Sequence, residues 1–270
     1  LAVYDLGKLY STDKLGERNE ETSIAKYTRA LQGFLQIEPN SKKLKPYVQY
    51  RIGKMFCYGL GTEQDYEKAF EWFERSAKQK NKFAQFSLAN LYYYGSGVEK
   101  DLSQAFLWYQ RASSQGQPYA AYSIAQMYRY GEYVTKDNDT AQRYYKQALS
   151  GFLKIENDDM ANDDLFYKLG QMFKLGLGTD SDVTKAIEYF KRSAEMNNKN
   201  GFFEYGKALL TGEHIPQDTD SAVKLLEKAV KLKNINSKRF LALEYISGEH
   251  LEQDIEKGIA LLTECADSGD

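Results

Sequence analysis

Residues that commonly carry catalysis or hold metal ions are scarce in this chain. Among its 270 residues there are two histidines and two cysteines. Neither cysteine, Cys57 or Cys265, stands beside a histidine that could activate it as a nucleophile. The chain has no Gly-x-Ser-x-Gly, His-Glu-x-x-His or Cys-x-x-Cys motif. We therefore expect a protein that is not an enzyme, with no catalytic residues, no cofactor and no metal.

Long apolar runs and an excess of charge of one sign are also missing. No apolar run approaches the roughly 20 residues that cross a bilayer. The 36 basic and 38 acidic residues leave a net charge of −2. We therefore expect no membrane contact, and nucleic-acid binding through this segment is not favoured. Two isolated cysteines fit a reducing compartment, which predicts a cytoplasmic location unless a signal segment lies outside this sequence.

What the chain does have is one amphipathic pattern that recurs seven times. A small residue anchors each copy, at Gly7, Gly53, Ala89, Ala125, Gly170, Gly206 and Ala242. A second small residue follows sixteen positions later, at Ser23, Ala69, Ala105, Ala141, Ala186, Ala222 and Gly258. Small residues that face each other let two helix axes approach closely. Each copy is therefore expected to form a pair of packed helices.

Two further columns mark where the helices of each pair end and begin. Six positions after the anchor stand Asp13, Gly59, Gly95, Gly131, Gly176, Gly212 and Gly248. Glycine can take the left-handed conformation that closes a helix. Twelve positions after the anchor stand Asn19, Asp65, Asp101, Asp137, Asp182, Asp218 and Asp254. Such side chains accept hydrogen bonds from the free N–H groups of a helix N-terminus, so this column should begin each second helix.

These columns predict an all-α fold, a solenoid of about seven helix pairs forming a single repeat array over residues 1–270. The predicted repeats are about 1–46, 47–82, 83–118, 119–163, 164–199, 200–235 and 236–270. Repeats one and four share an insert, residues 30–38 and 148–156, which predicts a longer second helix in each. The segment from Pro39 to Pro46 is expected to be a loop, because proline cannot continue a helix. Both chain ends lie inside repeats, so we expect a fragment of a longer protein.

Three groups of residues have both a structural and a functional interpretation. His214 and His250 occupy the same place in adjacent repeats and could bind zinc together, but glycine or tyrosine at that place in other repeats favours a turn position. The acidic run 156–164 lacks the ordered spacing of a calcium loop, which favours a solvated connector and helix cap. The aromatic columns, with Trp72 and Trp108 among them, favour a core between repeats over base stacking.

The outward face of each first helix varies between repeats, unlike the core columns. Its candidate partner-binding residues are Arg51, Lys54, Asn90, Tyr93, Gln126, Arg129, Lys168, Gln171 and Lys174. First helices commonly line the concave surface of helix-pair solenoids. This polar and basic face could therefore bind an acidic peptide. A merely solvated helix face would show the same pattern, so both interpretations stay open.

Residues 50–77, YRIGKMFCYGLGTEQDYEKAFEWFERSA, closely resemble the Sel1-like repeat. The pattern of that family is LGxxYxxGxGVxxDxxKAxxWYxKAAxxG, and the resemblance covers almost the whole chain. It implies a right-handed superhelix of α/α hairpins related to tetratricopeptide repeats. It also implies a non-enzymatic scaffold that binds a protein or peptide in a groove lined by the first helices. Asp13 and the two histidines depart from the pattern, which puts local turn geometry in doubt.

A narrower resemblance concerns the shared insert and the residues 164–179 that follow it. Together they look like the repeat tails of mobilisation relaxases carried by mobile elements of Gram-positive bacteria. This resemblance implies an alternative function, as the accessory C-terminal segment of a DNA-mobilisation protein. The catalytic domain would then lie outside this sequence.

Overall fold

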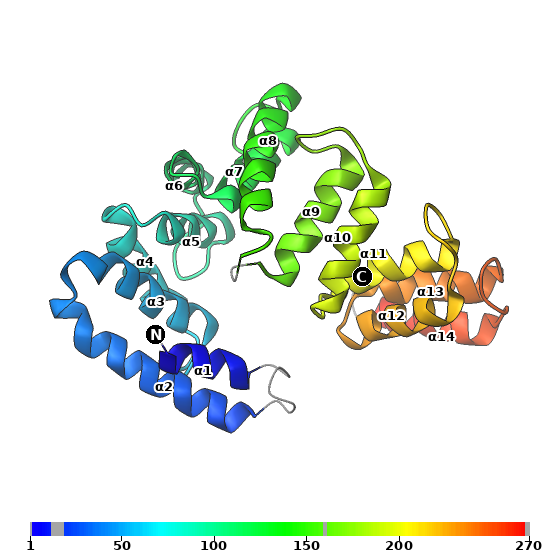
Figure 1. The fold of residues 1–270 in the computed structure, drawn as a ribbon, viewed down its shortest axis with the longest axis horizontal. Coiled ribbons are helices and arrows are strands. Elements are labelled where there is room, and N and C mark those ends of the chain that lie inside the picture. The colour runs from blue at the N-terminus through cyan, green and yellow to red at the C-terminus, as the bar shows by residue number, and fades with distance from the viewer. Residues whose placement is uncertain (1, 12–18, 159–160, 268–270) are drawn as a thin grey trace. The chain divides into compact units, whose positions relative to one another are not determined.

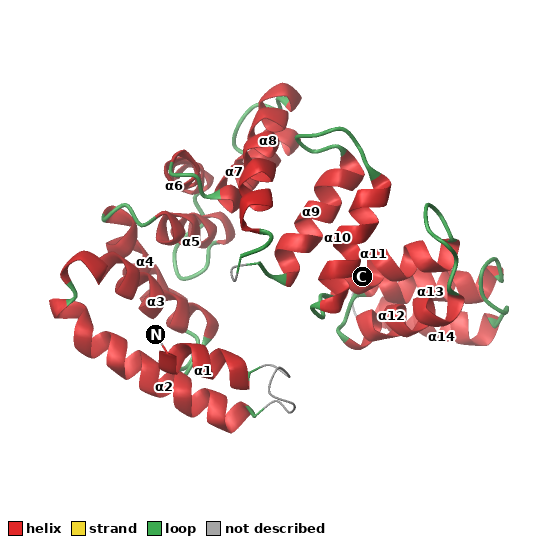
Figure 2. Cartoon of the chain, viewed as in Figure 1, coloured by secondary structure: helices red, strands yellow, loops and turns green. Residues whose placement is uncertain are grey.

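A computed structural model of the chain describes residues 2–11, 19–158 and 161–267. Over these ranges every regular element is a helix and no β-strand occurs (Figures 1 and 2). The chain divides into two compact units, Leu1–Ala148 and Leu149–Asp270, called unit 1 and unit 2 below. The single repeat array over the whole chain stays a prediction, and Asp13 lies outside the described residues.

Unit 1 holds four successive helix pairs. Its helices are α1 (Ala2–Tyr10), α2 (Glu20–Ile37), α3 (Lys45–Tyr58), α4 (Tyr66–Lys78), α5 (Lys82–Tyr94), α6 (Leu102–Ser114), α7 (Pro118–Tyr130) and the first part of α8 (Asn138–Ile155). Unit 2 begins within α8 and holds three further pairs. Its helices are α9 (Asp163–Leu175), α10 (Val183–Glu195), α11 (Lys199–Thr211), α12 (Thr219–Lys231), α13 (Ile235–Ser247) and α14 (Ile255–Asp267).

The helices pack in the order in which they follow one another along the chain. We call the odd-numbered helices A helices and the even-numbered ones B helices. In six pairs the A helix packs closely on the B helix that follows it, from α1 on α2 to α13 on α14. In the seventh, Tyr122 of α7 meets Tyr145 of α8 with ring centroids 5.5 Å apart. The B helices α2, α4, α6, α10 and α12 also pack on the next A helix, so the predicted helix-pair solenoid is confirmed within each unit.

Both columns that were expected to delimit the helices do so. The glycines at the ends of six A helices have φ between +62° and +74°, the left-handed region: Gly59, Gly95, Gly131, Gly176, Gly212 and Gly248. Each side chain of the second column accepts a hydrogen bond of 2.8–3.0 Å from a backbone N–H three residues later: Asn19, Asp65, Asp101, Asp137, Asp182, Asp218 and Asp254. These local bonds set the register of every hairpin.

The shared insert has the predicted effect on helix length, but the proline-flanked segment differs from the expectation. Helices α2 and α8 are 18 residues long, whereas α4 is 13. The segment expected to be a loop forms two short 3₁₀ helices, Glu38–Asn40 and Lys42–Leu44, and Pro46 lies in the first turn of α3. Proline is tolerated there because the first turn of a helix needs no N–H donor for its own hydrogen bonds.

The core contains a column that the sequence analysis missed. Twenty positions after the anchor, a large side chain of the B helix is buried: Tyr27, Phe73, Tyr109, Tyr145, Phe190 and Leu226. A Cβ atom added to Gly53 would lie 2.6 Å from the Phe73 ring, and one added to Gly170 would lie 2.5 Å from the Phe190 ring. The anchor is therefore small mainly because a large side chain lies flat on it. Trp72, one position earlier in the sequence than Phe73, is only half-buried.

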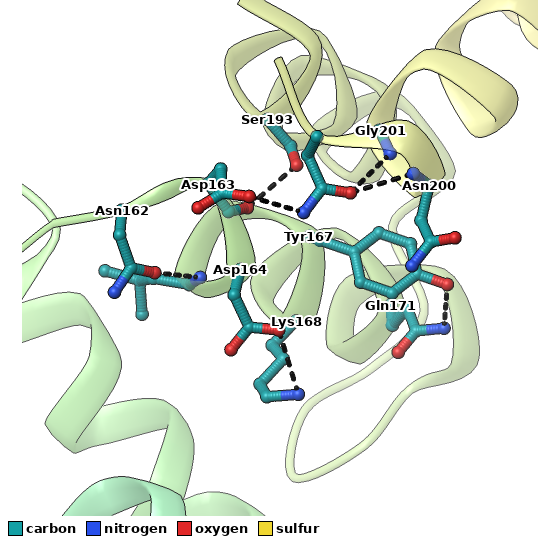
Figure 3. Close-up of polar contacts among 11 residues, drawn as sticks. Asn162, Asp163, Asp164, Tyr167, Lys168, Gln171, Ser193, Asn200 and Gly201 are labelled. Carbon is teal, nitrogen blue, oxygen red and sulfur yellow. Dashed lines mark hydrogen bonds and ion pairs between the residues drawn. The ribbon is translucent and has the colours of Figure 1, made fainter. Parts of the chain in front are cut away.

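A second unpredicted column caps five A helices, and three of its members, Asn81, Asn198 and Asn234, also tie the helix to the preceding repeat. Asn198 accepts hydrogen bonds from the backbone N–H groups of Asn200 and Gly201 at the start of α11, and its Nδ2 donates to Asp163 at 2.9 Å. Ser193 donates to the backbone carbonyl of Asp163 at 2.8 Å (Figure 3). The other members of the column also cap A helices: Asn81, Gln117, Asn162 and Asn234. One side chain thus starts a helix and holds its neighbour.

Candidate partner-binding surface

The nine candidate partner-binding residues, which we call the A-helix stripe, lie along A helices of both units. Eight of them are half-buried and Lys174 is exposed. Unit 1 carries Arg51, Lys54, Asn90, Tyr93, Gln126 and Arg129, whereas unit 2 carries Lys168, Gln171 and Lys174. The structure therefore describes two groups, one in each unit, and the chemistry of the two groups differs.

Arg51 and Lys54 lie on α3 among aromatic rings. The guanidinium of Arg51 lies 4.9 Å from the ring centroid of Tyr4 and 5.0 Å from that of Tyr47, and its Nε donates to the Tyr47 hydroxyl at 3.1 Å. The ammonium of Lys54 lies 5.7 Å from the ring centroid of Tyr58. Burial, together with the neighbouring cations Arg51 and Lys8, lowers the pKa of Lys54. No carboxylate pairs with either residue in the part of the chain that the structure describes.

Asn90 and Tyr93 on α5 have partners within the protein. Asn90 Oδ1 accepts a hydrogen bond of 2.6 Å from the hydroxyl of Tyr109, a residue of the newly found core column. The Tyr93 hydroxyl donates to Glu132 Oε2 at 2.6 Å. This bond, with burial and the charge of Glu132, raises the pKa of Tyr93 to about 12. Asn90 therefore helps to join the two helices of its own pair, and Tyr93 helps to join its repeat to the next one.

Arg129 on α7 lies close to a buried hydroxyl group that lacks a partner. Tyr145 is 1% exposed, and its hydroxyl makes no hydrogen bond with the described residues. Burial raises the pKa of Tyr145 to about 12, and nearby Arg129 opposes this rise. Tyr145 occupies the same column as Tyr109. The residue that accepts the Tyr109 hydrogen bond is Asn90, and Gln126 occupies the equivalent position in the repeat of Tyr145. Gln126, with the longer amide side chain, is half-buried.

This difference predicts opposite effects of the same substitution in two repeats. Tyr145→Phe removes a buried hydroxyl without a partner, so the free energy of unfolding should rise by up to about 1 kcal/mol. Tyr109→Phe leaves the Asn90 carbonyl without its donor and should cost about 0.5–1.5 kcal/mol. Chemical denaturation of the two variants beside the wild type measures both values. Equal effects would show that the Tyr145 hydroxyl has a hydrogen-bond partner after all.

In unit 2 the charges of the stripe lysines are paired with carboxylates of the same unit. Lys174 donates to Glu204 of α11 at 2.8 Å, and Lys168 lies 3.3 Å from Asp164 one turn earlier on α9. Gln171 donates to the Tyr167 hydroxyl at 2.7 Å, and Figure 3 shows this bond together with the Lys168 pair. The lysines of unit 2 therefore offer less uncompensated charge to a partner than the cations of unit 1.

The two histidines have different surroundings. His214 has φ +65°, the left-handed conformation that Gly61, Gly97 and Tyr133 also adopt at this place, and this confirms its role as a turn residue. His250 lies outside that region, and its Nδ1 lies 2.9 Å from Oε2 of Glu244, which is 7% exposed. Among the described residues no three or more histidine, cysteine or acidic side chains gather as metal ligands.

The cysteines and the acidic run take structural places. Cys57 is half-buried, Cys265 is buried, and both are free thiols. In the acidic run, Glu156 accepts hydrogen bonds from Tyr189 at 2.9 Å and from Arg192 at 3.1 Å. Asn162 caps α9 through the Leu165 N–H, so the described part of this run connects and caps helices.

None of the described helices combines the length and the apolar character that crossing a membrane needs.

Comparison with known proteins identifies the repeat. The family model of the Sel1 repeat matches six segments of the chain, 46–81, 82–117, 118–151, 167–198, 203–234 and 236–270. The pair α1–α2 lies outside these matches, although Gly7, Asn19 and Ser23 occupy the same columns. No curated protein matches the sequence.

Crystal structures with a similar fold include those of two bacterial proteins. A Sel1 repeat protein from Oxalobacter formigenes is 24% identical, with a TM-score of 0.64 over 98% of this chain and 99% of that one. The protective antigen c5321 of uropathogenic Escherichia coli is also 24% identical, with a TM-score of 0.57. That match covers 100% of this chain but 54% of the antigen. These matches give no support to the relation with relaxase tails.

Proposed function

Because the chain belongs to the Sel1 repeat family, we propose that it is an interaction scaffold whose A-helix stripe binds a peptide or an extended segment of a partner domain. Sel1 repeats generally mediate contacts between proteins, and proteins built from them are generally not enzymes. The proposal accordingly assigns binding of a protein or peptide to this chain, without a cofactor and without a catalytic step.

The observation that carries the proposal is the contrast between constant and variable positions within one fold. The positions that join the helices of a pair are small and buried in repeat after repeat, as Ala69, Ala105 and Ala186 are, each 0% exposed. The stripe positions on the same hairpins change from cation to amide to tyrosine and remain partly accessible. Within a unit, successive hairpins that present different polar groups at equivalent positions are suited to binding an extended peptide.

The test is a selection of peptides from a displayed library of disordered protein segments. The stripe variant carries Lys54→Ala, Tyr93→Ala, Arg129→Ala and Lys168→Ala. The matched control carries Glu71→Ala, Lys78→Ala and Gln110→Ala, all exposed on B helices. For peptides selected on the wild type, the stripe variant should bind at least about tenfold more weakly by fluorescence anisotropy, a loss of about 1.4 kcal/mol. The control should bind within about twofold of the wild type.

Circular dichroism and thermal melting show whether the variants keep their fold. Selected peptides that bind the stripe variant as tightly as the wild type would overturn the proposal. A library that yields no binding peptide would overturn it as well, because a surface that reads extended peptides should capture some of them.

A further inference from the structure

Charge is distributed unevenly over the A helices, although it is nearly balanced over the whole chain. Helices α3, α5 and α7 of unit 1 contain no aspartate or glutamate. They contain the cations Lys45, Arg51, Lys54, Lys82 and Arg129. The A helices of unit 2 each carry at least one carboxylate, at Asp163 and Asp164, Glu204 and Glu244. The absence of acid is therefore a property of three successive A helices of unit 1.

Arg51 is a cation of this acid-free face that contacts aromatic rings from two repeats. Its guanidinium is held over Tyr4 of α1 and Tyr47 of α3, so it joins two successive repeats. Such stacking holds the planar group in one orientation while leaving N–H donors for a carboxylate, which arginine binds through two parallel hydrogen bonds. The described partners of Arg51 are tyrosines, without a carboxylate among them.

Lys54 lies one turn further along α3 and strengthens the positive charge at this place. Its charged neighbours are Arg51 on the same helix and Lys8 on α1. Besides burial, the charges of Arg51 and Lys8 both contribute to the lowered pKa of Lys54, and an anion bound beside Lys54 would oppose their effect. Besides burial, the charge of Asp5, the acidic residue of α1, contributes to the raised pKa of Tyr4 and of Tyr27. Among the described residues, no carboxylate forms an ion pair with Arg51 or Lys54.

The equivalent positions of unit 2 show the contrast. Lys168 stands in the column of Arg51, but Asp164 lies 3.3 Å from its ammonium group. Lys174, which stands in the column of Cys57, is paired with Glu204 at 2.8 Å. A partner that brought carboxylates to these lysines would have to compete with carboxylates already in place. At Arg51 and Lys54, unit 1 offers the same kind of helix face without a carboxylate paired to the cation.

We propose that the contact segment of the partner is an acidic peptide and that unit 1 binds it at Arg51, Lys54 and Lys8. This inference rests on the proposed function and adds to it a ligand chemistry and a location. Carboxylates of the peptide take the place of the missing acidic residues. The ring of Tyr58, 62% exposed beside Lys54, offers an apolar surface to the side chains between them. An extended nucleic acid is not favoured, because its affinity depends on many phosphate contacts.

The test measures binding of two fluorescein-labelled peptides by anisotropy. One peptide alternates glutamate and serine around a single leucine, and the other has glutamine in place of every glutamate. Wild type should bind the glutamate peptide at least about tenfold more tightly than the glutamine peptide, since charge-assisted hydrogen bonds are roughly twice as strong as neutral ones. The affinity should fall as salt is added.

Matched pairs of charge removals locate the site. Arg51→Gln with Lys54→Gln should weaken binding of the glutamate peptide by about tenfold to thirtyfold. Lys168→Gln with Lys174→Gln, which removes the same charge from unit 2, should change it by less than about twofold. Because Arg51 packs on Tyr4 and Tyr47, the single substitutions Lys54→Gln and Lys8→Gln are measured as well. Each should weaken binding without loss of helical circular dichroism.

Three results would overturn this inference. The first is equal binding of the two peptides, and the second is an equal loss in the unit 1 and unit 2 variants. The third is oligothymidylate binding at least as tight as that of the glutamate peptide, with the same dependence on Arg51 and Lys54. Neutral peptides that bind the wild type but not the stripe variant would remove this inference alone and leave the proposed function standing.

Discussion

Gly53→Ala is expected to destabilise unit 1 by about 1–3 kcal/mol, although alanine is the better helix former. A methyl group at this position would lie 2.6 Å from the ring of Phe73, which is 1% exposed and has no room to move away. The helix preference of alanine, worth about 1 kcal/mol, is smaller than the strain of such overpacking. Thermal and chemical denaturation of the purified variant measure the difference.

Gly33 supplies the matched control within the same unit. It lies in the interior of α2, and an added Cβ would meet no atom within 4 Å. Gly33→Ala should therefore stabilise the protein by about 0.5–1 kcal/mol. Phe73→Ala should cost about 3–5 kcal/mol alone, and combining it with Gly53→Ala should cost less than the sum of the two. If the two losses of stability were additive, Gly53 would not be small because the Phe73 ring packs on it.

Ala105→Leu is expected to cost about 1–3 kcal/mol by forcing α5 and α6 apart. Ala105 is 0% exposed and belongs to a core cluster with Ala89, Leu88 and Tyr109. Three additional carbon atoms cannot be placed there without moving a helix, because protein cores are close-packed. The midpoint of chemical denaturation reports the loss of stability.

Gln110 on α6 gives the control for Ala105→Leu. It is exposed on the same helix, so Gln110→Leu adds an apolar side chain without disturbing the packing. Its effect should stay within about 0.5 kcal/mol. A melting temperature unchanged by Ala105→Leu would contradict the interpretation of the small-residue column as a helix crossing point.

The local chemistry of single residues made most of the fold predictable. Asp65 or Gly59 acts within one turn of its own position in the chain, so an ordered column of such residues delimits helices from the sequence alone. The large-residue column at Phe73 was equally visible in the sequence. It was missed because the neighbouring tryptophans, Trp72 and Trp108, are the more conspicuous residues.

The candidate surface was less predictable because its partners come from distant parts of the chain. Lys174 donates a hydrogen bond to Glu204 in the next repeat, and Tyr93 donates one to Glu132, which follows α7. The A-helix pattern gives the position of a side chain on its helix but not the residue that meets it from a neighbouring hairpin. The sequence therefore predicted nine equivalent polar residues, whereas the structure separates paired lysines from unpaired cations.

The asparagines that cap α11 and α13 affect how the protein opens locally. Asn198 holds the first turn of α11 with its carbonyl oxygen and holds Asp163 at the start of α9 with its amide nitrogen. Asn234 does the same between α13 and α11, through the carbonyl of Lys199. Fraying of one hairpin therefore releases a contact of the hairpin before it. Breathing motions, and the amide hydrogen exchange that reports them, should be shared between neighbours rather than confined to a single repeat.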